Sequence, residues 1–272
     1  MHNKKYYFHN FYHLGDNVFN MIFFKIIKTY ILENNITIHY YCQPEYIKQA
    51  AEFNDIPNII IEPIQDKHHN SHELWIDKEV RGFSWTKIYN KNCKAGLKRS
   101  FYDKFFASFF NNVLEIMKIK ITIKTFYYKD RNLKQRFIII NKQFNNKYRK
   151  IDILILNSQP MSGQFNYNKA EWDEHIRYLN NTYKVITTTK VDGIPCTMDD
   201  NLTIKDIAAL SIQATIIIAV NSGVVPGLLN KYTLNNVKHV YVFDDRCKFS
   251  YKKFENMDSI KEITVENINK YI

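Results

Sequence analysis

Glycine is scarce in this sequence, with 7 residues in 272, and the glycine-rich motifs of several enzyme classes are absent. There is no Gly-x-Gly-x-x-Gly, no Gly-x-x-x-x-Gly-Lys-Ser/Thr and no Gly-x-Ser-x-Gly. The first two motifs bring backbone amides close to phosphate groups, and the third places a serine nucleophile on a tight turn. Their absence argues against a standard dinucleotide-dependent enzyme, a P-loop NTPase and an α/β-hydrolase.

Cysteine is also sparse, and its spacing excludes the usual cysteine-based sites. The four cysteines lie far apart, and no Cys-x-x-Cys pair occurs. A zinc knuckle and a thioredoxin-type redox site both need such pairs. The usage fits a reduced, cytosolic protein. The cysteines are Cys42, Cys93, Cys196 and Cys247.

Long apolar runs are missing as well. A helix that spans a bilayer needs about 20 apolar residues, and the most apolar stretch, residues 18–32, is interrupted by Lys25 and Lys28. The first ten residues, MHNKKYYFHN, lack the apolar core of a signal peptide. We therefore expect a cytoplasmic protein whose contact with a membrane, if it has one, is peripheral.

The composition that remains is ordinary for a globular protein, at 45% hydrophobic and 24% charged residues. Heavy use of Asn, Ile, Lys and Tyr indicates the base bias of an AT-rich genome. The formal net charge of +11 favours polyanionic partners such as nucleic acid, acidic membranes or phosphorylated substrates. The basic residues are scattered along the chain, which favours solvated faces over a nucleic-acid-binding stripe.

The first half of the chain alternates between strand and helix patterns. We expect strands at residues 5–10, 36–41 and 59–61, helices at 18–33 and 44–53, and a short strand at 74–76. Alternation of this kind predicts a parallel, doubly wound sheet. An aromatic helix at 100–117 and a polar helix at 129–147 follow, before a basic stretch that marks a domain boundary between residues 148 and 149.

The second half repeats the alternation. We expect strands at 151–156, 183–188, 216–220 and 237–243, and helices at 169–180, 204–212, 224–229 and 268–272, with Thr203 as an N-cap. The predicted fold class is α/β, with two Rossmann-like, doubly wound domains at residues 1–148 and 149–272 that face each other across a cleft.

Three of the seven glycines fall in predicted strand-to-helix turns: Gly15, Gly163 and Gly223. Such turns leave backbone N–H groups at the carboxyl edge of a parallel sheet, where anionic ligands bind in open α/β folds. In a glycine-poor chain the placement indicates close approach to a ligand or a positive φ. Alternatively, the glycines serve only to form the turns.

Two segments resemble the ADP-heptose (lipopolysaccharide heptosyltransferase) type of GT-B glycosyltransferase. The first is the segment HLGDNV at residues 13–18, before an apolar helix, and the second is LTIKDIAALSIQATIIIAVNSG at residues 202–223. The chain departs from the family at Asn221, where the family has Asp, and at Pro226, where a His often follows. Short enzymes of this kind occur in giant viruses and in bacteria with AT-rich genomes.

The resemblance implies a role for each matching position. Asp16 matches the proposed general base, with His13, Gly15 and Asn17 on the acceptor side. The second half would bind a nucleotide sugar as co-substrate, with no bound cofactor or metal. Ser222, Gly223 and Val224 would contact its diphosphate, as would Ser162 and Gly163, and Asn221 is expected to bind the donor. Lys190 is the expected charge partner of the phosphates, and Thr188 and Thr189 would border the base or ribose.

The function that follows is transfer of a sugar from a nucleotide sugar to a hydroxyl of a glycan, lipid or protein-linked acceptor. Transfer with inversion is expected by analogy with the family, although retaining enzymes share the architecture. Two alternatives stay open: a basic protein that binds nucleic acid, and a nucleotide-sugar-binding protein without catalytic activity. The adjacent acids Asp244 and Asp245 are interpreted as loop caps, and His68, His69 and His72 as a solvated loop.

Overall fold

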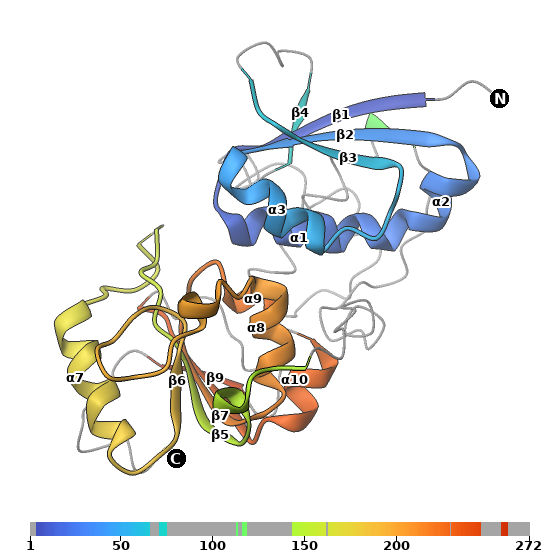
Figure 1. Cartoon of the computed structure of the whole chain (residues 1–272). Helices are drawn as coiled ribbons and strands as arrows, with labels where there is room; N and C mark the ends of the chain where they lie inside the picture. The colour runs from blue at the N-terminus through green and yellow to red at the C-terminus, as the bar shows by residue number, and fades with distance from the viewer. Residues whose placement is uncertain are drawn as a thin grey trace, which may run out of the picture. The chain divides into compact units, whose positions relative to one another are not determined.

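The structure is a computed structural model that describes residues 4–65, 71–74, 113, 116–118, 143–161, 163–228, 230–245 and 257–260. The chain forms two compact units, Met1–Asp130 and Arg131–Ile272 (Figure 1). The boundary expected between residues 148 and 149 stays a prediction. Tyr148, just before that boundary, lies within the second unit, where its hydroxyl donates to the carbonyl of Cys196 over 3.1 Å.

The first unit contains a four-stranded parallel sheet. Its strands are β1 (Lys4–Asn10), β2 (Ile36–Cys42), β3 (Ile59–Pro63) and β4 (His72–Glu73). They lie in the order β3-β2-β1-β4, so the chain winds outward through three strands and then returns to the other side of β1. This is the strand order of the Rossmann fold.

The helices described for the first unit lie on one face of this sheet (Figure 1). They are α1 (Leu14–Phe24), α2 (Lys28–Glu33) and α3 (Ile47–Glu52), with 3₁₀ turns η1 (Lys25–Ile27) and η2 (Pro44–Tyr46). The core between sheet and helices is aromatic, because Phe8 and Tyr40 from the strands meet Phe24 from α1. Alternate residues of β2 supply the rest of the buried face.

Helix α1 begins four residues earlier than the sequence pattern suggested. The expected turn at 13–17 is instead the first turn of the helix, with His13 in an extended conformation as its N-cap. The carboxylate of Asp16 accepts a hydrogen bond from the backbone N–H of His13 over 3.3 Å. An acid three residues after the N-cap stabilises such an early start. Gly15 therefore lies inside a helix rather than in a turn that needs glycine.

The second unit contains a five-stranded parallel sheet. Its strands are β5 (Ile151–Leu156), β6 (Val185–Thr187), β7 (Ala214–Val220), β8 (His239–Phe243) and β9 (Met257–Ile260). They lie in the order β6-β5-β7-β8-β9, the second common order of doubly wound sheets. The continuous apolar residues of β5 and β7 are buried on both faces of this sheet.

Helices cover both faces of the second sheet, with α7 on one side and α8 and α10 on the other (Figure 1). The helices are α7 (Lys169–Asn180), α8 (Ile204–Ser211), α9 (Val225–Leu228) and α10 (Lys231–Asn236), with 3₁₀ turns η5 (Asn146–Tyr148) and η6 (Thr197–Asp200). Trp172, Ile176 and Leu179 of α7 pack on alternate residues of the central strands. Thr203 caps α8, as predicted, by accepting from the N–H of Asp206.

The expected elements agree closely with those described, and α/β as the fold class is confirmed. The strand expected at 183–188 is shorter, and residues 143–145, expected at the end of a helix that otherwise lies mostly outside the described residues, have no regular structure. The strand expected at 74–76 was also misplaced, because Leu74 follows β4 rather than beginning a strand. His72, predicted to lie in a solvated loop, is exposed but belongs to β4 and pairs with Phe8. The predicted aromatic helix at 100–117, the helix at 268–272, His68 and His69 fall mostly or wholly outside the described residues. None of the described helices combines the length and apolar character that crossing a bilayer requires.

Candidate functional site

The strand order of the second unit places its candidate site between β5 and β7. Successive crossovers leave these two neighbouring strands in opposite directions, to β6 on one side and to β8 on the other. A crevice opens at the carboxyl ends of strands where the order reverses in this way, and ligands of doubly wound proteins bind there. The segments that follow β5 and β7, residues 157–168 and 221–224, are the two that the sequence analysis singled out.

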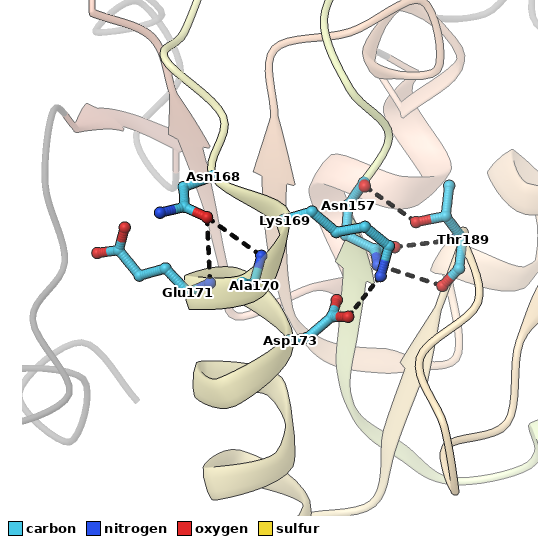
Figure 2. A network of polar contacts seen from close by, with 7 residues as sticks. All are labelled: Asn157, Asn168, Lys169, Ala170, Glu171, Asp173 and Thr189. Atoms are coloured by element: carbon cyan, nitrogen blue, oxygen red, sulfur yellow. Dashed lines mark hydrogen bonds and ion pairs between the residues drawn. The ribbon is translucent and has the colours of Figure 1, made fainter.

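Asn157, the first residue after β5, clasps the end of β6 (Figure 2). Its side-chain oxygen accepts from the backbone N–H groups of Thr188 and Thr189 over 3.2 and 2.8 Å. Its amide nitrogen donates to the Thr189 carbonyl over 3.2 Å. The Thr189 hydroxyl in turn donates to the Asn157 carbonyl over 2.9 Å. Because Asn157 is almost fully buried, these bonds fix the relative positions of the two strand ends.

The loop from β5 to α7 crosses the carboxyl edge of the sheet. Gly163 has φ +61°, which favours glycine, and nothing lies within 4 Å of where a Cβ would be. The carbonyl of Gln164 accepts from the N–H of Asp245 over 3.0 Å, and Phe165 packs against Phe243. Because β7 lies between β5 and β8, this loop passes over the end of β7.

The turn after β7 leaves three successive amides unbonded. Within the described residues, the backbone N–H groups of Ser222, Gly223 and Val224 have no protein acceptor, whereas the N–H of Val225 donates to the Ser222 carbonyl over 3.1 Å. Consecutive amides of this kind form a concave donor surface for an anion. The helix that follows, α9, has only four residues. The helix dipole expected here is therefore small, and the amides themselves supply the positive potential.

Ser222 carries a second unbonded donor. Its side chain is 7% exposed, and its hydroxyl has no hydrogen-bond partner in the described part of the chain. A buried polar atom without a partner costs about 1–3 kcal/mol, so native proteins keep few of them. A hydroxyl beside three unbonded amides is suited to a ligand that accepts several hydrogen bonds.

Asn221 joins the ends of β7 and β8. Its backbone N–H donates to the Phe243 carbonyl over 3.0 Å, and its side-chain amide donates to the carboxylate of Asp244 over 2.7 Å. Asp244 is fully buried. The interpretation of the two adjacent acids as loop caps holds for Asp245, which accepts from the backbone N–H of Asn166. For Asp244 it is incomplete, because its partner is the side chain of a predicted ligand-binding residue.

Two lysines bring positive charge to this end of the second unit. Lys190, the predicted phosphate partner, is exposed and forms no ion pair within the described residues. Lys169, at the start of α7, forms an ion pair with Asp173 (Figure 2). Asp173 is nearly buried, and its other carboxylate oxygen has no partner among the described residues. The pKa of Tyr167 is raised to about 12, mainly by burial of its phenol and secondly by the nearby charge of Asp173.

In the first unit the order reverses between β1 and β4, and Asp16 lies in the first turn of the helix that leaves β1. The N-terminus of an eleven-residue helix stabilises negative charge there. Asp16 and its neighbour His13 are half-buried, so both are partly accessible. The predicted base thus lies at the carboxyl edge of its own sheet.

A buried polar network holds this helix start in place. The hydroxyl of Tyr40 donates to the side-chain oxygen of Asn17 over 2.7 Å and accepts from the amide of Asn20 over 2.9 Å. Asn10 and Asn20 both donate to the carbonyl of Leu74, just after β4. Burial raises the pKa of Tyr40 well above its usual value, so its phenol stays protonated and able to donate.

Within each unit the described members of the predicted site follow the carboxyl ends of neighbouring strands, and some of them have structural partners. Asn17, Thr188 and Thr189 form hydrogen bonds with other protein groups. Their expected contacts with a ligand stay predictions. Ser162 falls outside the described residues. Sequence reasoning missed Asn157, Lys169 and Asp244 as members of the site. The signal for Asn157 and Asp244 was available, because each is a polar residue directly after a buried strand.

No protein-family profile matches the sequence. No curated protein matches it either. Solved structures do. E. coli heptosyltransferase WaaC with ADP aligns over 98% of this chain and 98% of its own, with a TM-score of 0.55 and 9% identity. WaaC with ADP-2-deoxy-2-fluoro heptose gives the same values. E. coli ADP-heptose lipopolysaccharide heptosyltransferase II aligns over 95% of this chain and 91% of its own, with a TM-score of 0.50 and 8% identity.

At such low identity the likeness shows the fold, and it extends over nearly the whole of both chains. The protein therefore has the two-unit α/β fold of these heptosyltransferases, as the resemblance of its two motifs implied. How its two units face each other stays a prediction, as does the AT-rich source. Activity and ligands have to be argued from the site.

Proposed function

We propose that this protein is a glycosyltransferase that moves a sugar from a nucleotide sugar to a hydroxyl of a glycan, lipid or protein-linked acceptor. The observation that carries the proposal is the turn after β7. Three unbonded amides and the unbonded, buried hydroxyl of Ser222 lie together at the crevice-forming edge of the second sheet. A diphosphate has enough acceptor oxygens to bond all four donors.

The same donors suit the chemistry of transfer. When the acceptor oxygen attacks the anomeric carbon, the bond from that carbon to the diphosphate oxygen breaks and negative charge grows on the leaving group. Amides that are already oriented stabilise this charge without reorganising during the reaction. Lys190 adds a positive charge from the neighbouring strand end, and the clasp of Asn157 on Thr188 and Thr189 keeps that strand end in position. Metal-independent transfer is part of this proposal.

The acceptor hydroxyl must lose a proton, and Asp16 is the proposed base. A carboxylate accepts that proton as the new carbon–oxygen bond forms. The hydrogen bond from the His13 N–H to Asp16 also caps α1, so the residue has a structural role beside the proposed chemical one. The proposal requires Asp16 to reach a sugar held by the second unit, and that arrangement of the units is part of the proposal.

A thermal-shift panel of nucleotide sugars tests the proposed ligand class. A ligand that binds only the folded protein stabilises it by about 2.7 kcal/mol at a concentration 100 times its Kd. We expect one of ADP-, GDP- or UDP-linked sugars to raise the melting temperature, together with its free nucleoside diphosphate. The absence of any shift across the panel at millimolar concentrations would contradict the proposal.

Two further measurements separate the alternatives. Release of the nucleoside diphosphate from the stabilising sugar donor, measured with and without acceptor, distinguishes an enzyme from an inactive binding protein. Binding to single-stranded DNA that falls steeply with salt would favour nucleic acid as the partner, because such binding depends on counterion release. We expect turnover of the donor and weak DNA binding. The cytoplasmic location and any peripheral membrane contact stay predictions.

A further inference from the structure

We propose that Asp244 is a positioning residue for the turn at 221–224, and that it requires an amide rather than a carboxylate at position 221. This inference rests on the proposed function, because the turn is the part of the site assigned to the diphosphate. It also gives a physical reason for the Asn that distinguishes this chain from the family its sequence resembles.

The first step is the register of the two strands. Val220 and Phe243 are paired at the ends of β7 and β8, so Asn221 and Asp244 are the first residues beyond the ladder. Their side chains meet over 2.7 Å, with the amide as donor and the carboxylate as acceptor. The Asn221 backbone also donates to the Phe243 carbonyl. Asn221 is thus held through both its backbone and its side chain, immediately before the three unbonded amides.

The second step is the burial of Asp244. Its side chain has no exposed surface, and a buried carboxylate is stable only when hydrogen-bond donors surround it. The Asn221 amide is such a donor. An ionised Asp at position 221 would supply none and would place a second carboxylate within hydrogen-bond distance of the first. Two carboxylates that close cannot both stay ionised without a large cost.

The third step connects the pair to the ligand. If residue 221 carried an ionised carboxylate beside Asp244, repulsion would displace the residue that precedes Ser222. The displacement would turn the amides away from a common point, and the added charge would repel a diphosphate. In this chain the single acid of the pair directly follows β8, and it accepts a hydrogen bond from the Asn221 amide. The Asn at 221 is therefore compatible with an active site and is no sign of a lost one.

A charge-swap series tests the inference. The variants are Asn221→Asp, Asp244→Asn and the double variant that carries both changes, with Glu174→Gln on the exposed face of α7 as a control for loss of one negative charge. The probe is whichever of ADP, GDP and UDP binds the wild type most tightly, and its Kd is measured by calorimetry. Circular dichroism and melting temperature report folding of every variant.

We expect Asn221→Asp to raise the Kd at least tenfold and Asp244→Asn to raise it a few-fold, because two amides still form a neutral hydrogen bond. The double variant restores one donor and one acceptor, so its Kd returns to within about threefold of the wild type. Glu174→Gln leaves the Kd unchanged. Should Asn221→Asp fail to fold, recovery of both folding and binding in the double variant supports the inference in its place.

Several results overturn the inference alone. They are an unchanged Kd in Asn221→Asp, a double variant that folds but binds no better than Asn221→Asp, and changes in melting temperature that leave the Kd values unaltered. The last result would make the pair structural only. A wild type that binds none of the three nucleotides would instead contradict the proposed function, and the inference would fall with it.

Discussion

Both units have a parallel sheet with a carboxyl edge at which the strand order reverses, but the polar groups at the two edges differ in how they are hydrogen-bonded. In the first unit the polar side chains at the edge bond one another, through Tyr40 and the buried amides of Asn10, Asn17 and Asn20. In the second unit the side chains of Asn157 and Asp244 are bonded, but the backbone amides of residues 222–224 are left without acceptors. Within the described residues, the first edge leaves only the side-chain oxygen of Asn20 in this network without a partner, whereas the second leaves a row of backbone donors unused.

This difference is the basis for proposing different chemistry at the two edges. An edge with unused amides suits an anion, whereas an edge that presents a carboxylate on a firmly held helix suits proton transfer. The comparison extends to single residues. Asp206 stands at the start of α8 as Asp16 stands at the start of α1, and each accepts from the backbone N–H of its N-cap residue, over 3.2 and 3.3 Å respectively. The local structure around the two acids is similar, so only a measurement of activity can distinguish a catalytic acid from a structural one.

Replacing each of these acids by Asn is expected to give the largest difference in activity between two matched variants. We expect Asp16→Asn to slow sugar transfer by about 10²–10⁴-fold, the range for loss of a general base. Its amide oxygen still accepts from His13, so folding and nucleotide binding persist. Asp206→Asn is the matched control, which loses less than about 1 kcal/mol of stability and keeps its turnover. Steady-state kinetics and unfolding curves measure both effects, and equal turnover in the two variants would remove Asp16 from the mechanism.

Removing the Asn157 side chain, which joins the ends of β5 and β6, is expected to give the next largest effect. Asn157→Ala leaves the N–H of Thr189 without an acceptor, whereas the N–H of Thr188 keeps the Ile155 carbonyl at 3.0 Å, so we expect a loss of about 1–3 kcal/mol in the free energy of unfolding. Nucleotide binding weakens as well, because the end of β6 is no longer fixed. Urea unfolding and calorimetry check the two effects. Asn181→Ala changes an exposed Asn of the same unit and should stay within about 0.5 kcal/mol of the wild type. A similarly small effect of Asn157→Ala would contradict the clasp.

In the first unit, Tyr40→Phe tests the corresponding network. Removing the hydroxyl leaves Asn17 and Asn20 each with one bond fewer, and we expect a loss of about 1–3 kcal/mol with nucleotide affinity unchanged. Because folding raises the pKa of Tyr40, this contribution is complete below the unfolded phenol pKa of about 10 and is lost as pH rises through the folded value. Tyr7→Phe, at a partly exposed ring, is the control. Equal stabilities of the two variants between pH 6 and 9 would argue against the network.

Two buried serines of the second unit sharpen the comparison further. Ser222→Ala removes a hydroxyl without a partner, so we expect equal or higher stability without ligand and a Kd for nucleotide raised about tenfold, or about 1.4 kcal/mol. Ser211→Ala removes a hydroxyl that donates to the Ala208 carbonyl over 2.7 Å and contacts Thr233. It should lose about 1–3 kcal/mol of stability and keep its affinity. If Ser222→Ala instead lost stability and kept its affinity, the hydroxyl would not be a ligand donor.

The pattern of apolar residues was sufficient to predict most of the fold. The strand at 151–156 and the helix at 169–180 have the expected bounds, because a continuous apolar run and a capped amphipathic segment are strong local signals. The start of α1 was predicted too late, because an N-cap histidine is a weak signal. The edges that carry Gly163 and the amides of 222–224 were located from the same strand-and-turn pattern.

Side-chain partners could not be predicted in the same way. Asn157 and Thr189 are 32 residues apart, and Asn221 and Asp244 are 23 apart, so their contacts depend on strand order and register rather than on local sequence. Strand order itself follows from crossovers that a single sequence does not specify. For the same reason Asp244 was interpreted as a loop cap, although its hydrogen bond with Asn221 connects it to the candidate site.

Hydrogen–deuterium exchange with and without the nucleotide sugar that stabilises the protein tests the central claim most directly. If the amides after β7 bind the diphosphate, the amides of residues 222–224 exchange rapidly in the ligand-free protein and become strongly protected at saturating ligand, while the interior strands of both sheets show no change. Saturating ligand that protects other segments and leaves exchange at 222–224 unchanged would contradict the claim.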